Sequence, residues 1–171
     1  VWTMGILNPS EWTAEWIGTD QKFERKRGSP PPDNSMPDPW FRKTFELETL
    51  PARALVHVAS VGYHELYVNG KRIGDHVLMP GVSDHNRRAR YVTYDIASEL
   101  QPGKNALALW LGTSWSIFPQ YKAPGKPMSP IVLAQAELEF PNGRQQRIVS
   151  DTSWKTHPSP IAPLGKPSRL G

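Results

Sequence analysis

Residues 65–73 read Glu-Leu-Tyr-Val-Asn-Gly-Lys-Arg-Ile, and this stretch decides the fold class. Asn69-Gly70 lies between two runs of strand-forming residues, and Asn-Gly is a strong signal of a β-hairpin because both turn positions need a positive φ. Asn142-Gly143 repeats the pattern between residues 134–140 and 145–149. We therefore expect two antiparallel hairpins with tight turns.

Further strand signals lie on either side of these hairpins. Aromatic or apolar residues alternate with polar ones from Phe41 to Leu47, as in a strand with one buried face. Residues 52–61 and 105–112 are mostly apolar, which is typical of strands covered on both faces. Trp110 continues the strand face of Ala106 and Ala108, and we expect it in the core. About seven or eight short strands predict an all-β fold, an antiparallel β-sandwich.

The composition excludes several classes of protein. The chain of 171 residues fits a single domain, and it contains no cysteine, which excludes a disulfide scaffold, a thiolate metal site and a cysteine nucleophile. No apolar run is long enough for a membrane span. The net charge of +4 comes from 20 basic and 16 acidic residues that are interspersed, unlike the basic face of a nucleic-acid-binding protein. We expect neither nucleic acid nor a membrane as a partner.

Candidate binding residues lie mainly in two long loops rich in proline and glycine, residues 18–39 and 113–130. Exposed rings at Trp115 and Tyr121 would stack on the apolar face of a sugar, while Asp75 and Asn34 would bond its hydroxyls. Asp33-Asn34 also offers oxygen ligands of the kind that Ca²⁺ takes. The alternatives are that the rings close the end of the sandwich and that Asp75 and Asn34 are ordinary turn residues. No catalytic motif is recognisable, and His57 is expected to be a packed, hydrogen-bonded residue of its strand.

A longer pattern extends from the first hairpin over nearly the whole chain. In chain order its runs are Trp12–Gly18, Phe41–Phe45, Gly62–Gly81, Tyr91–Ile96, Gly103–Ala106, Leu111–Trp115, Ser150–Lys155 and Ser159–Ile161. Together they resemble the amino-terminal β-sandwich of bacterial α-L-rhamnosidases, glycoside hydrolase family 78.

This resemblance implies a jelly-roll-like, galactose-binding-domain-like sandwich over residues 1–171, with residues 1–17 and 155–171 as connecting segments. The chain starts with valine, and we expect it to be a fragment of a larger multidomain enzyme, periplasmic or secreted, that removes terminal α-L-rhamnose with inversion. The catalytic acids would then lie on an (α/α)₆ barrel outside this chain, and this domain would be accessory and non-catalytic. Some family members use such a sandwich as a calcium-dependent rhamnose-binding module, so a rhamnose-containing glycan and Ca²⁺ are the implied ligands. The alternative is a domain that braces the barrel and has no sugar site.

Overall fold

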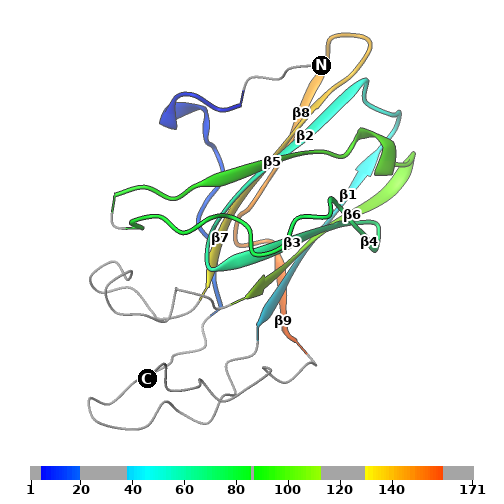
Figure 1. The fold of residues 1–171 in the computed structure, drawn as a ribbon. Coiled ribbons are helices and arrows are strands. Elements are labelled where there is room, and N and C mark those ends of the chain that lie inside the picture. The colour runs from blue at the N-terminus through cyan, green and yellow to red at the C-terminus, as the bar shows by residue number, and fades with distance from the viewer. Residues whose placement is uncertain (1–4, 20–37, 86, 113–129, 160–171) are drawn as a thin grey trace, which may run out of the picture.

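The computed structural model describes residues 5–19, 38–85, 87–112 and 130–159, which form two antiparallel sheets packed face to face (Figure 1). The five-stranded sheet has the order β4-β3-β6-β1-β9, and the four-stranded sheet has the order β5-β2-β7-β8. The strands are β1 Pro39–Leu47, β2 Arg53–Val61, β3 Tyr63–Val68, β4 Lys71–Arg72, β5 Tyr91–Asp95, β6 Gly103–Gly112, β7 Ile131–Glu139, β8 Gln145–Val149 and β9 Lys155–Pro158. The predicted all-β sandwich is confirmed.

The two hairpins form as antiparallel pairs, but their turns differ. Asn69 and Gly70 have φ angles of 51° and 85°, as expected for a turn in which both central positions are left-handed. In the β7–β8 hairpin only Gly143 has a positive φ, 80°, so the prediction of the same turn there is wrong. The physical reason is Pro141, whose ring fixes φ near −65° and favours a right-handed turn before the glycine. The Gly143 N–H closes this turn on the Phe140 carbonyl at 2.9 Å.

The hydrophobic core lies between the two sheets. Side chains alternate along β1 as predicted, with Phe41 and Leu47 buried and Arg42 exposed. Strand β6 alternates in the same way, so Leu107, Leu109 and Leu111 face the core. Strand β2 is buried on both faces, as its apolar composition predicted.

Trp110 does not lie in the core, and that prediction is wrong. It does share a strand face with Ala106 and Ala108, but this face points outward, because the leucines between them occupy the inner face. The small side chains of Ala106 and Ala108 gave no sign of which face was buried. The aromatic ring therefore lies on the open side of the five-stranded sheet.

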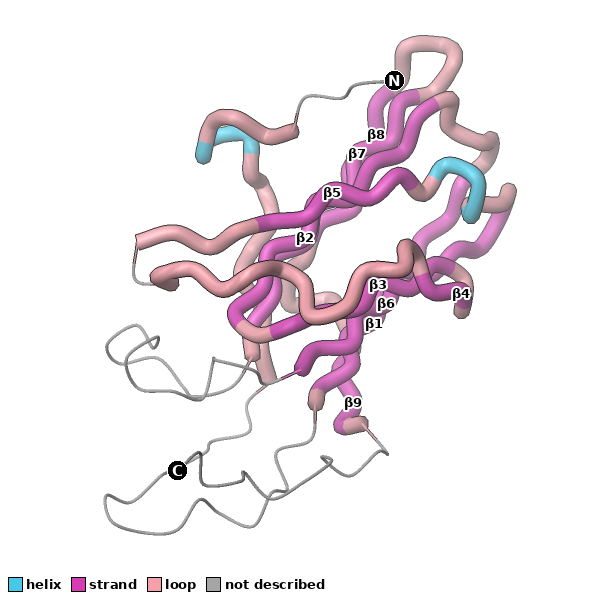
Figure 2. Tube along the Cα trace, viewed as in Figure 1, coloured by secondary structure: helices cyan, strands magenta, loops and turns pink. Residues whose placement is uncertain are grey.

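The N-terminal segment, defined here as residues 5–17, runs beside the four-stranded sheet (Figure 2). It contains the short 3-10 turn η1, Pro9–Glu11. Glu15 donates its backbone N–H to the Ser150 carbonyl at 2.7 Å, and Ile17 forms a β-bridge with Val132. At the other end of the chain, the first residues of the predicted connecting segment 155–171 form β9, which pairs with β1.

Candidate functional site: an aromatic groove on the five-stranded sheet

A groove of about 810 Å³ lies on the outer face of the five-stranded sheet. This volume falls in the range of pockets that hold small-molecule ligands. Its lining comes from β1, β3, β6, β9 and the first hairpin turn. The lining residues are Trp40, Phe41, Arg42, Tyr67, Gly70, Ala106, Ala108, Leu109, Trp110, Lys155, Thr156 and His157.

Two tryptophans form the aromatic part of the groove. Trp40 of β1 is directly opposite Trp110 of β6 in the sheet register, and their ring centroids are 5.6 Å apart at an interplanar angle of 54°. Trp40 remains 42% exposed, which is high for a tryptophan in the middle of a sheet. The floor beside them is low because Ala106 and Ala108 project only methyl groups from β6.

The β3 side of the groove carries a carboxylate whose charge is compensated. Glu65 accepts a hydrogen bond from the Tyr67 hydroxyl at 2.7 Å and pairs with the Arg72 guanidinium at 3.1 Å. Partial burial and the bond to Glu65 raise the pKa of Tyr67 above its usual value, so the phenol stays protonated. Tyr67 is thereby fixed as an amphipathic wall of the groove.

The β9 side carries cations that face one another. Arg42 of β1 and Lys155 of β9 are directly opposite in the sheet register, and both line the groove. Like charges at directly opposite positions destabilise a sheet. Among the residues that the structure describes, neither side chain has a hydrogen bond or ion pair to an acidic group. His157 lies beside them on β9, opposite Trp40.

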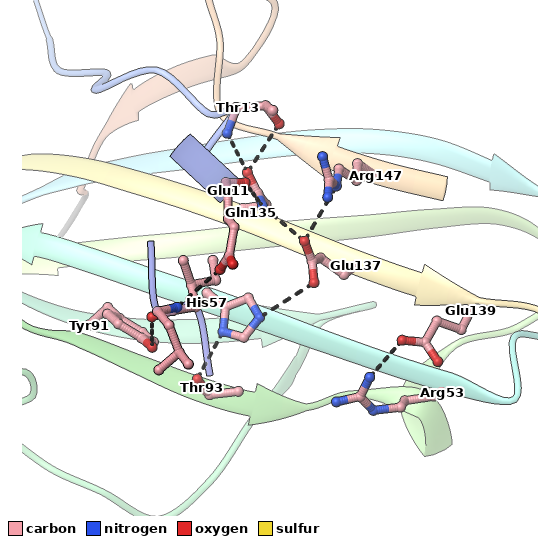
Figure 3. A network of polar contacts seen from close by, with 12 residues as sticks. Glu11, Thr13, Arg53, His57, Tyr91, Thr93, Gln135, Glu137, Glu139 and Arg147 are labelled. Atoms are coloured by element: carbon pink, nitrogen blue, oxygen red, sulfur yellow. Dashed lines mark hydrogen bonds and ion pairs between the residues drawn. The ribbon is translucent and has the colours of Figure 1, made fainter. Parts of the chain in front are cut away.

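A second polar constellation lies under the N-terminal segment, on the outer face of the four-stranded sheet (Figure 3). The buried Gln135 accepts from the Thr13 backbone N–H at 2.8 Å and from the Thr13 hydroxyl at 3.1 Å, and it donates to the Glu11 carbonyl at 3.0 Å. It also donates to the Glu137 carboxylate at 3.0 Å. Its amide is therefore fully occupied in attaching the segment to β7.

His57 belongs to the same constellation, and its prediction as a packed, hydrogen-bonded residue is confirmed. The ring is 2% exposed, its Nδ1 lies 2.9 Å from the Thr93 hydroxyl, and its edge contacts include Trp12 and Tyr91. Burial lowers the pKa of His57 below its usual value, although the Glu137 carboxylate 4.0 Å away acts in the opposite direction. The imidazole is therefore neutral at pH 7, and this constellation serves packing.

A third set of polar groups lies between the sheets. Tyr94 donates its hydroxyl to Nε2 of His64 at 3.0 Å, and Nδ1 of His64 donates to the Ser60 hydroxyl at 2.8 Å. Ser60 in turn donates to the Gly62 carbonyl at 3.0 Å. Burial lowers the pKa of His64 to about 4 and raises that of Tyr94 to about 12. With the His64 proton on Nδ1, the two ring nitrogens and the hydroxyls of Ser60 and Tyr94 all have hydrogen-bond partners. The chain of bonds is therefore a structural element of the core.

Of the four binding residues chosen from the sequence, only Asp75 is described, and it does not line the groove. Trp115, Tyr121 and Asn34 lie outside the described residues, so their roles stay predictions. Asp75 is described, and its carboxylate is fully exposed beyond β4 with the His76 ring 3.8 Å away. No group of three or more potential metal ligands occurs among the described residues, and the calcium prediction also stays a prediction. No helix in the part of the chain that the structure describes is long and apolar enough to cross a membrane.

The sequence did contain a signal for the groove that we did not use. Along β6 the leucines alternate with Ala106, Ala108 and Trp110, and a strand with one buried face places its larger aliphatic residues inward. That alternation puts Trp110 outside, and the antiparallel register with β1 then places Trp40 beside it. The contribution of β9 has no comparable local signal, because it depends on a pairing between residues more than a hundred positions apart.

The fold and the groove together define a class, a β-sandwich domain with an aromatic groove on the outer face of one sheet. The family model described as the α-L-rhamnosidase N-terminal domain matches residues 49–164. The chain therefore belongs to the family of α-L-rhamnosidase N-terminal domains.

Individual relatives agree with this assignment. Two α-L-rhamnosidases of Formosa agariphila are each 32% identical to the chain, over 158 and 177 residues, and the matches cover 89% and 92% of this chain. The same matches cover 17% and 19% of those relatives, so the chain spans less than a fifth of their length.

Solved structures of α-L-rhamnosidases share the fold. The enzyme from Dictyoglumus thermophilum is 35% identical with a TM-score of 0.74, and that from Aspergillus terreus is 28% identical with a TM-score of 0.77. Each match covers 92% of this chain and 18% of the other. The Streptomyces avermitilis enzyme, solved in complex with L-rhamnose, is 32% identical with a TM-score of 0.66 over 74% of this chain and 12% of that one.

Proposed function

We propose that this domain is the non-catalytic accessory domain of an α-L-rhamnosidase and that its aromatic groove binds rhamnose-containing glycans. The observation that carries the binding proposal is the open pair of Trp40 and Trp110 over a floor of two alanines. Flat aromatic surfaces cover the apolar faces of sugar rings, while hydrogen-bonding groups at the rim meet the hydroxyls. Tyr67 and Arg42 supply such groups on either side.

The lining of the groove supports binding rather than cleavage. Glycosidic hydrolysis usually requires two carboxyl groups that face each other across the scissile bond. None of the described residues that line this groove is an aspartate or glutamate, and the nearby Glu65 is engaged by Tyr67 and Arg72. We therefore assign hydrolysis of terminal α-L-rhamnose to a separate catalytic domain of the same parent protein. The family relatives, of which this chain spans less than a fifth, have ample length for such a domain.

Calorimetric titration of the chain with L-rhamnose and with a rhamnosyl disaccharide tests this proposal. We expect saturable binding, weakened about tenfold or more by Trp40→Ala or Trp110→Ala, because a central aromatic anchor contributes upwards of about 1.4 kcal/mol. The matched control is Trp16→Ala, since Trp16 is similarly exposed at 44% but lies in the N-terminal segment away from the groove. Equal affinity of all three variants would place the sugar elsewhere, and no binding by the folded chain would reject a sugar site.

The same titration separates the groove from the site predicted in the loops. Repeating it with Ca²⁺ and again with a chelator tests the calcium prediction, because a groove built from rings and cations does not need the ion. Trp115→Ala tests the loop directly. Binding that requires Ca²⁺ and Trp115 but tolerates Trp40→Ala would favour the loop site over the groove.

A bracing role against the catalytic domain is the second candidate function, and one segment of the described residues favours it. Between β4 and β5, Val77 and Leu78 are 69% and 66% exposed, and Leu78 has a left-handed φ of 58° that a branched residue adopts only at a cost. The test is the thermal stability of the parent enzyme with the changes Val77→Ser and Leu78→Gly. A loss of that stability, together with no sugar affinity of this domain, would assign the bracing role.

A further inference from the structure

The positive charges of the groove gather at its β9 end. Glu65 and Arg72 neutralise each other on the β3 side, at 3.1 Å. On the opposite side, Arg42 and Lys155 stand across from each other in the β1–β9 register with no acidic partner among the described residues. His157 adds a ring nitrogen beside them. One end of the groove is thus electrostatically balanced and the other is a concentration of cations.

This arrangement lowers the stability of the sheet unless something compensates it. Facing cations on neighbouring strands repel each other. Other charged residues on this sheet avoid the problem, because Glu46 stands opposite Lys104 in the β1–β6 register. An anion bound between Arg42 and Lys155 would remove the repulsion, and a guanidinium presents a planar pair of donors suited to carboxylate or sulfate oxygens.

The distance from this pair to the aromatic rings points to the kind of anion. Arg42 lies two residues along β1 from Trp40, which corresponds to about 7 Å on the same strand face. A sugar stacked on Trp40 would therefore place its neighbour in the glycan chain over Arg42 and Lys155. An acidic group on that neighbour meets both cations without moving the stacked ring.

We infer that the β9 end of the groove is an anion subsite that recognises an acidic sugar residue adjacent to the rhamnose. The negatively charged group is the carboxylate of a uronic acid or a sulfate ester, and both present the same oxyanion chemistry to Arg42 and Lys155. This inference rests on the proposed function, because it requires the neighbouring sugar to stack on the tryptophans. It adds a substrate class, rhamnosides within acidic polysaccharides.

The test compares matched ligands on the chain itself. A rhamnosyl-uronate disaccharide, its carboxyl-reduced neutral counterpart and a sulfated analogue of that counterpart are titrated at low salt and again at high salt. We expect the two acidic disaccharides to bind about tenfold more tightly than the neutral one, with the preference declining at high salt because exposed charges are screened. Preference for only one acidic ligand identifies the carboxylate or the sulfate as the group recognised.

The variant Arg42→Gln/Lys155→Gln should bring the ratio of acidic to neutral affinity close to one. The matched control, Arg88→Gln/Lys104→Gln, removes two exposed charges outside the groove and should keep the ratio, which excludes an effect of net charge alone. Equal affinity for acidic and neutral ligands would overturn the subsite and leave the proposed function intact. No affinity for any of the disaccharides would overturn both, and equally tight binding of inorganic sulfate alone would reject recognition of a sugar.

Discussion

The two outer faces of the sandwich both carry aromatic and polar residues, which are packed and hydrogen-bonded on one face and exposed on the other. On the four-stranded sheet, Trp12 packs edge-on against Tyr91 at 5.5 Å, and the buried Gln135 uses both ends of its amide in hydrogen bonds. On the five-stranded sheet, Trp40 is 42% exposed, and Arg42 faces another cation. The first face is covered by the N-terminal segment, and the second is open in the described structure. Aromatic and polar residues occur on both faces, and the proposed binding face differs from the other in its open rings and uncompensated charges.

The largest expected effect concerns the enclosed histidines. The pKa of His64 is about 4 in the folded chain because of burial, while the unfolded value is near 6.5, so the folded state resists protonation. This stabilisation is fully present above about pH 6.5 and is lost as the pH falls toward 4, for a total of about 3 kcal/mol at about 1.4 kcal/mol per unit. His57, whose pKa burial also lowers, adds to the loss in the same direction.

Urea denaturation at a series of pH values between about 7.5 and 5 measures the part of this loss that falls in that range, about 2 kcal/mol. That window stays above the titration of the carboxylates. His64→Gln should flatten the dependence of stability on pH, and His76→Gln, at an exposed histidine, is the matched control. An unchanged slope in His64→Gln would mean that this ring takes up a proton as readily in the folded state as in the unfolded one, contrary to the enclosed geometry.

An effect of intermediate size compares how much side chains on the two outer faces contribute to the free energy of unfolding. Gln135→Leu removes three partly buried hydrogen bonds to Glu11 and Thr13, so we expect a loss of about 2 kcal/mol in the free energy of unfolding. Thr44→Leu is the control on the open face, where the side chain is exposed, and should change stability by about 0.5 kcal/mol or less. Similar losses in both variants, measured by urea denaturation, would show that the covering segment contributes little to stability.

The smallest effect has the opposite sign. Arg42→Glu replaces a repelling pair with an attracting one opposite Lys155, and we expect a gain of about 0.5 kcal/mol in the free energy of unfolding. The same change should abolish any preference for acidic ligands. Matched thermal melts of this variant and of Arg88→Glu, an equal charge change at an exposed position outside the groove, check the gain. A loss of stability in Arg42→Glu would show that the two cations are already compensated.

Local patterns predicted the framework well because strands and turns are encoded by neighbouring residues. The alternation in β1 and the Asn69-Gly70 turn are both confirmed, since each depends on short-range rules. The groove depends on the pairing of β1 with β9, which is not a local property, and on which face of β6 is buried, for which the alternating leucines were a local signal that we did not use. Placing Trp110 in the core was the resulting error. The covering of β2 by the N-terminal segment likewise depends on Gln135, far along the chain.

The attachment of the N-terminal segment has a consequence for synthesis on the ribosome. Glu15 leaves the ribosome well before its partner Ser150, which follows 135 positions later. At roughly 5–20 residues per second, about 7 to 27 seconds separate the two. During that interval the outer face of β2, with His57, has no cover from this segment, so docking of the segment is a late step that follows pairing of β7. A nascent chain stalled before Gln135 would leave Trp12 accessible to chaperones.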